Sequence, residues 1–118
     1  MNSVELKQRT MAFAVRVLKL ADTLPGQPSA RTIAHQIARR GTSVAANYRA
    51  ALRAKSPANF INKITIVLAE ADETGFWLEM TGQTGLLPAK RLATLRMEAP
   101  ELTKIFNATR TSARNHQS

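Results

Sequence analysis

Arginine side chains dominate the middle of this sequence. Between Asp22 and Glu70 every charged residue is basic. On an α-helix, where successive residues are about 100° apart, one group of these side chains falls on a single narrow face. This group, the basic ridge, consists of Arg31, His35, Arg39, Arg49 and Arg53. Guanidinium groups match phosphate oxygens, so the ridge could contact a nucleic-acid backbone without reading its sequence. The alternative is an ordinary solvated face, although such faces usually mix both signs of charge.

A second polar group lies between the basic ridge and the apolar face of the same segment. Arg40, Ser43 and Asn47 recur there at spacings of three and four residues. They could bind a ligand, or they could form hydrogen bonds within the protein. Polar side chains at a buried edge usually serve structure, so we expect the structural role.

Carboxylates gather further along the chain, at Glu70, Asp72 and Glu73. Paired carboxylates can perform acid–base chemistry or hold a metal. Helical bundles that bind two iron ions use Glu-x-x-His motifs, and neither His35 nor His116 belongs to such a motif. We therefore expect no metal site. We expect Glu70 or Glu73 to pair with an arginine of a neighbouring helix or subunit.

The sequence contains none of the familiar catalytic motifs. There is no glycine-rich phosphate loop, no GxSxG and no HExxH. Cysteine does not occur, which excludes disulfides, thiolate zinc sites and a cysteine nucleophile. Ser43 has no histidine at helical spacing. These observations predict a protein that is not an enzyme and carries no cofactor.

Four amphipathic segments must position these side chains. The apolar spacing predicts helices over about residues 3–23, 30–54 and 57–81 and from residue 88 onward, separated by proline- and glycine-containing breaks. Gly41 lies on the apolar stripe of the second segment and predicts close approach of another helix. Pro100 should kink or split the fourth.

These elements define an all-α fold, an antiparallel up-down-up-down four-helix bundle over residues 1–109. Residues 110–118 are polar and unperiodic, and we expect a disordered tail there. The third segment also carries a surplus stripe beside its core face, formed by Ile66, Glu70, Glu73 and Trp77. Such a surplus predicts an oligomer interface. The alternative is that Trp77 packs into the edge of the core.

The 118 residues suffice for one domain. Their net charge of +9 and isoelectric point of about 11.2 attract polyanions. Nucleic acid is the first partner to expect, and an anionic membrane surface is the second. The polar N-terminus is unlike a secretory signal, and no apolar run reaches the roughly 18 residues that cross a bilayer. Of the two polyanions we therefore expect nucleic acid and no membrane partner, in a cytoplasmic protein.

Two longer stretches carry a recognisable pattern. Residues 40–49 contain Arg-x-x-Ser-Val-x-x-Asn, and residues 66–79 contain Ala-Asp-Glu-Thr-x-x-Trp-Leu. Together they resemble the bacterial four helix bundle protein family, also called the 23S ribosomal RNA intervening-sequence protein family. The resemblance covers about residues 3–106. It departs from the family pattern at Gly75, where leucine is usual.

The resemblance implies a ring-shaped homopentamer of antiparallel bundles without enzymatic activity. Some members are encoded within intervening sequences of ribosomal RNA genes. A related branch, the accessory proteins of diversity-generating retroelements, binds nucleic acid and a reverse transcriptase. The resemblance implies structural or assembly roles for Arg40, Ser43, Asn47, Glu70, Glu73 and Trp77.

From the residues and the resemblance together, we expect a non-enzymatic homopentamer that binds RNA or DNA through the basic ridge. The alternative is a protein–protein adaptor or scaffold, with a partner such as a polymerase.

Overall fold

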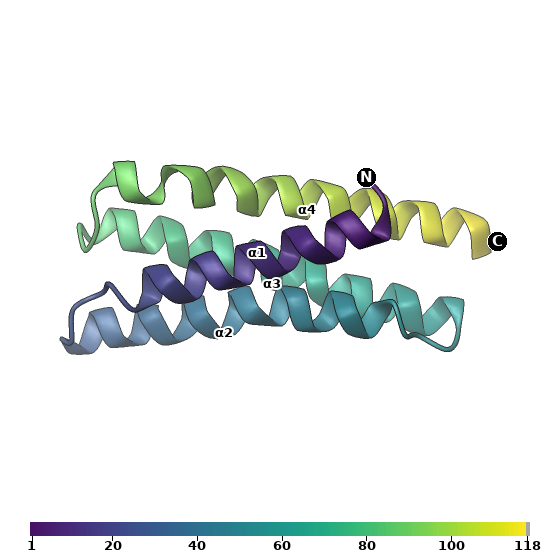
Figure 1. The fold of residues 1–118 in the computed structure, drawn as a ribbon, viewed down its shortest axis with the longest axis horizontal. Helices are drawn as coiled ribbons and strands as arrows, with labels where there is room; N and C mark the ends of the chain where they lie inside the picture. Colours follow the sequence, from purple (N-terminus) through teal and green to yellow (C-terminus); the bar gives the residue numbers. More distant parts are fainter. Residues whose placement is uncertain (118) are drawn as a thin grey trace.

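The computed structural model describes residues 1–117 and contains, over those residues, four α-helices and no β-strand (Figure 1). The helices are α1 (Ser3–Ala21), α2 (Pro28–Ala51), α3 (Pro57–Gln83) and α4 (Ala89–Gln117). They alternate in direction along a body of 49 × 21 × 21 Å. The predicted all-α, antiparallel up-down-up-down four-helix bundle is therefore confirmed.

Local sequence signals explain where three of the helices begin. The Asn2 side chain accepts a hydrogen bond from the Glu5 N–H (2.8 Å), and the Glu5 carboxylate accepts one from the Asn2 N–H, which forms a capping box at α1. The Ser56 hydroxyl accepts from the Asn59 N–H (3.1 Å) at the start of α3. Helix α2 begins at Pro28, two residues earlier than predicted, because proline is well suited to the first helical turn.

The four apolar faces meet in one continuous core. Its largest fully buried side chains include Phe13 of α1, Ile37 of α2, Ile64 of α3 and Phe106 of α4. Gly41 allows α1 and α2 to approach closely, since a Cβ atom added there would overlap Val17 Cγ2. The close approach predicted at this glycine is confirmed.

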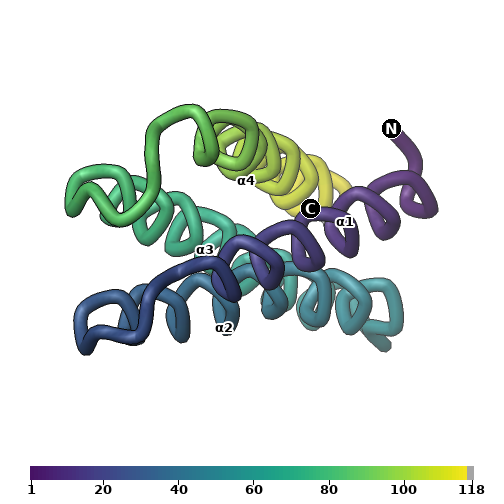
Figure 2. Tube along the Cα trace, turned by 60° about the vertical axis from the view of Figure 1, so that its left-hand side comes forward, coloured from purple at the N-terminus to yellow at the C-terminus, as the bar shows by residue number. Residues whose placement is uncertain are grey.

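The helices do not surround this core evenly. α2 packs extensively against both α1 and α3, and α3 does so against α4, whereas α1 and α4 meet over a much smaller area. α1 crosses the bundle obliquely (Figure 2). Polar contacts join α1 to α4: Arg9 donates two hydrogen bonds to the Glu98 carboxylate (2.6 and 2.7 Å), and Arg16 donates one to the Thr94 hydroxyl (2.8 Å).

Helix α4 is one long helix. It is not split at Pro100, which lies exposed between the buried Ala99 and Leu102. It also continues through residues 110–117, where a disordered tail was predicted, and this prediction is wrong for those residues. Arg110 is half-buried and donates towards Thr65 of α3 (3.5 Å) and Asn107 (3.3 Å), which attaches the last turns to the bundle. Residue 118 lies outside the described residues.

Candidate nucleic-acid interface

The basic ridge lies on the outer face of the bundle. Arg31, His35, Arg39 and Arg49 project from α2 opposite its buried residues, and Arg53 follows in the turn after the helix. All five ridge side chains are exposed. Within residues 1–117 the two ion pairs are Arg9–Glu98 and Arg40–Glu70, and neither involves the ridge. The ridge charges are therefore available to an external anion.

The dimensions of the ridge suit an extended polyanion. Arg31 and Arg49 are eighteen positions apart, which corresponds to about 27 Å at 1.5 Å per helical residue. One strand of duplex DNA places about eight phosphates along that length. Thr42 and Ala46 in the middle of the ridge are small, and the Thr42 hydroxyl donates to the Ala38 carbonyl of its own helix (2.7 Å). A backbone could cross this stretch without a steric obstacle.

The end of the ridge near the start of α2 has additional positive potential. Gln27 caps this helix without a side-chain hydrogen bond, and the first turn contains no acidic residue. The positive end of the helix dipole is thus not neutralised by a local carboxylate. Beside it, a shallow hollow is lined by Pro28, Arg31, Thr32, His35 and Gln36. An anion approaching there would meet the helix end and two ridge side chains together.

The three polar residues beside the ridge make internal contacts. Arg40 donates to the Glu70 carboxylate of α3 (2.9 Å) and to the Gln36 side chain (3.3 Å). The expected pairing of Glu70 with an arginine is therefore present, and it joins α2 to α3. Asn47 donates to both the carbonyl and the hydroxyl of Ser43 (2.9 Å each), within α2. These contacts fit the structural role expected for the group.

The predicted interface residues of α3 divide between core and surface. Trp77 is half-buried and packs against the core, and its indole N–H is buried without a hydrogen-bond partner. Phe76 meets the Trp77 ring edge-on at 5.0 Å between centroids. Ile66 and Phe76 remain 41% and 47% exposed, and Glu73 is exposed as well. Trp77 thus reaches the core edge while its neighbours face outward, and the oligomer interface stays a prediction.

One exposed feature was not predicted. α1 carries Val4, Met11, Val15 and Leu18 on its surface, all of them at least 42% exposed. Their spacing of seven, four and three residues is that of a heptad and was readable from the sequence. The stronger apolar stripe of the same helix, which forms the core, obscured it.

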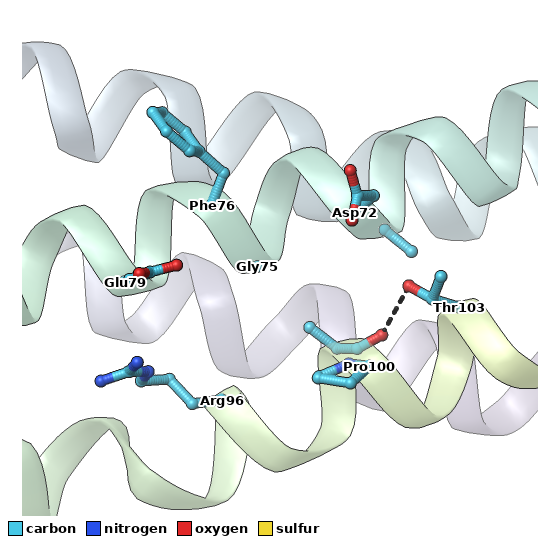
Figure 3. A pocket seen from close by; sticks show the side chains of 9 residues that line it. Asp72, Gly75, Phe76, Glu79, Arg96, Pro100 and Thr103 are labelled. Carbon is cyan, nitrogen blue, oxygen red and sulfur yellow. Dashed lines mark hydrogen bonds between the residues drawn. The ribbon is translucent and has the colours of Figure 1, made fainter.

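A hollow lies between α3 and α4, near the carboxylates (Figure 3). Its lining includes Gly75 and Ala99 together with the charged side chains of Asp72, Glu79 and Arg96. The Thr103 hydroxyl nearby donates to the Ala99 carbonyl (2.9 Å) and is occupied by that bond. The hollow places no nucleophile beside a base. Across residues 1–117 there is also no cluster of three or more histidine, cysteine or acidic side chains that could hold a metal.

Taken together, four antiparallel helices with one uniformly basic outer face define a basic four-helix bundle protein. The family described as 23S rRNA-intervening sequence protein matches residues 2–108, and the chain belongs to this family. The resemblance seen in the sequence is thereby confirmed.

A solved structure shares the fold over nearly the whole chain. It is the crystal structure of a protein of unknown function from the S23 ribosomal protein family of Bacteroides thetaiotaomicron, with 33% sequence identity and a TM-score of 0.86. The similarity covers 94% of this chain and 99% of that one. No curated protein sequence matches significantly. No helix in residues 1–117 has the length and apolar character needed to span a membrane.

Proposed function

We propose that this protein is a cytoplasmic, non-enzymatic homo-oligomer that binds the backbone of RNA or DNA through the basic ridge. The homopentamer implied by the family resemblance is the oligomer we propose. One observation supports the binding role above all others: five basic side chains lie exposed on one face, and no carboxylate of the described chain pairs with them.

Physical chemistry indicates the kind of binding to expect. Exposed arginines contact phosphates and release counterions, so affinity should fall steeply with salt and depend little on base sequence. RNA and duplex DNA are therefore tested side by side.

A matched pair of charge variants tests the assignment. The ridge variant replaces Arg31, Arg39, Arg49 and Arg53 with glutamine. The control variant replaces four exposed basic residues of α4, Lys90, Arg91, Arg96 and Lys104, with glutamine and loses the same charge. Gel-shift titrations with a 25-nucleotide RNA and a 25-base-pair DNA at 100 mM salt should show a large loss of affinity for the ridge variant and a small one for the control.

Two outcomes would contradict the proposal. Equal losses in both variants would mean that binding follows net charge and not the ridge. Unchanged binding by the ridge variant would exclude the ridge as the site.

The exposed apolar residues of α3 favour a second candidate function, that of an adaptor or scaffold for another protein such as a polymerase. Pull-down experiments after nuclease treatment distinguish the two functions. Partners held through nucleic acid should disappear, whereas directly bound partners should remain.

A further inference from the structure

The exposed apolar side chains of α1 form one straight surface, here the α1 stripe. Val4, Met11, Val15 and Leu18 share this face, which points away from the buried Leu6, Phe13 and Val17 side of the helix. A surface helix of an isolated bundle needs polar residues on its outer face. Four exposed apolar side chains in heptad register are instead typical of a face that packs against another helix.

A second straight surface, the α3 stripe, lies on the outside of α3. Ile66, Ala69, Glu73, Phe76 and Met80 follow one another at spacings of three and four residues. Ile66, Ala69, Glu73 and Phe76 are exposed, and Met80 is half-buried. The Trp77 indole lies beside them at the edge of the core. α3 therefore also presents a helix face without a partner inside the chain.

The two stripes match in length. Residues 4–18 and 66–80 each extend over fourteen helical steps, or about 21 Å. They also lie on helices that do not touch: α1 contacts α2 and, more sparsely, α4, whereas α3 contacts α2 and α4. α1 and α3 are thus diagonal in the bundle, and their outer faces point away from each other. One copy cannot join its own two stripes, but two copies can.

Most of the charges beside the two stripes are of opposite sign. Lys7 and Lys19 are exposed on either side of the α1 stripe, and the exposed Asp22 follows at its C-terminal end. Glu73 is exposed within the α3 stripe, and Asp72 is exposed at its edge towards α4. No ion pair within residues 1–117 involves any of these residues. Docking of α1 on α3 would bring lysines to carboxylates, while docking of α1 on α1 or α3 on α3 would oppose like charges. Such an arrangement selects the unlike pair.

We infer that the α1 stripe of one copy packs against the α3 stripe of a second copy. This inference deepens the proposed function, on whose homo-oligomer it rests, by naming the surfaces through which the copies meet. The contact is heterologous, because each copy uses a different face, and repetition of such a contact closes into a ring when the rotation allows.

The arrangement has a consequence for the basic ridge. When neighbouring copies join through the diagonal helices α1 and α3, α2 of each copy faces one side of the row and α4 faces the other. The basic ridges of successive copies would then adjoin on one surface. A polyanion could contact several ridges in turn, which strengthens binding without new side chains.

Two variants test the pairing of the stripes. The α1 variant is Val15→Glu/Leu18→Glu, and the α3 variant is Ile66→Glu/Phe76→Glu. All four positions are exposed, so the fold should persist, as circular dichroism can check. In a mixture of the two variants, the altered α1 face of one and the altered α3 face of the other both carry glutamates and repel each other. The control is Met97→Glu, the same kind of change at a single exposed apolar position of α4 outside both stripes.

Mass measurement by light scattering should show an oligomer for the unaltered protein and the control, and a 13.0 kDa monomer for each variant alone. A 1:1 mixture of the two variants should form a dimer and nothing larger, since one intact α1 stripe can dock on one intact α3 stripe. Only a heterologous contact gives this rescue.

The remaining outcomes overturn the inference in distinguishable ways. Variants that keep the oligomeric mass would show that the copies meet elsewhere, while the proposed function would stand. A dimer formed by either variant alone would indicate contact between like faces. A monomeric unaltered protein would refute this inference together with the oligomer of the proposed function, whereas RNA binding by the ridge would be judged separately from the gel shifts.

Discussion

Replacing Gly41 with alanine should destabilise the bundle, although alanine is the better helix former. Gly41 lies within α2, where the helix-propensity difference favours alanine by about 1 kcal/mol. The structure opposes this gain, because the new Cβ atom would overlap Val17 Cγ2 and lie 3.1 Å from Val17 Cβ. Val17 is fully buried and its β-branched side chain has one favoured rotamer in a helix, so it cannot turn aside.

The two effects differ in size. Overpacking a core costs about 1–3 kcal/mol, and a stiff, fully enclosed neighbour places this case in the upper part of that range. After the gain in helix propensity, we expect a net loss of about 1–2 kcal/mol in the free energy of unfolding. Gly75→Ala is the matched control. Its Cβ would make an ordinary 3.6 Å contact with Ala99 Cβ, so it should stabilise the protein by about 0.5–1 kcal/mol.

Urea unfolding followed by circular dichroism measures both changes at one fixed protein concentration, because the stability of the proposed oligomer would depend on concentration. Val17→Ala combined with Gly41→Ala should show favourable coupling, since it removes the overlapped methyl group. A Gly41→Ala protein as stable as Gly75→Ala would refute the close approach of α1 and α2.

Three further changes test other parts of the structure. Arg9 and Glu98 form the bidentate pair between α1 and α4, and a double-mutant cycle with glutamine at both positions should give a coupling of about 1 kcal/mol that weakens at high salt. Ser56→Ala removes the cap of α3 and should cost about 1 kcal/mol in thermal or urea unfolding. Burial raises the pKa of Tyr48 above its ordinary value of 10.0. The folded state therefore holds the phenol proton more tightly than the unfolded state, and the protein loses stability as the pH rises above about 10. Tyr48→Phe should lose less stability than the unaltered protein between pH 9 and pH 11, and equal losses would contradict the assignment.

The sequence predicted those features that depend on one helix at a time. Apolar spacing located the four helices, and the same spacing placed the basic ridge on the exposed side of α2. The glycine on an apolar stripe indicated the close approach at Gly41. The pairing of Glu70 or Glu73 with an arginine was expected because no histidine stood at the spacing of a metal site, and the structure shows it at Glu70.

Features that depend on two helices or on competing stripes were harder to predict. Arg9 and Glu98 are 89 positions apart, and only the packing of α1 beside α4 brings them together. The final turns of α4 have weak apolar periodicity, yet Arg110 attaches them to α3 through side-chain contacts. The exposed stripe of α1 was hidden because the core stripe of the same helix is stronger, and only burial in the folded chain separates the two.

The salt dependence of RNA binding tests the central claim most directly. Affinities of the unaltered protein and of the ridge variant should be measured between 50 and 300 mM salt and plotted as log K against log salt. Each phosphate contact contributes roughly 0.7 to the slope for a single strand and about 0.9 for duplex DNA. We predict a steep negative slope for the unaltered protein and a slope shallower by about two to four for the ridge variant. Identical slopes for the two proteins would show that the ridge arginines do not contact the backbone.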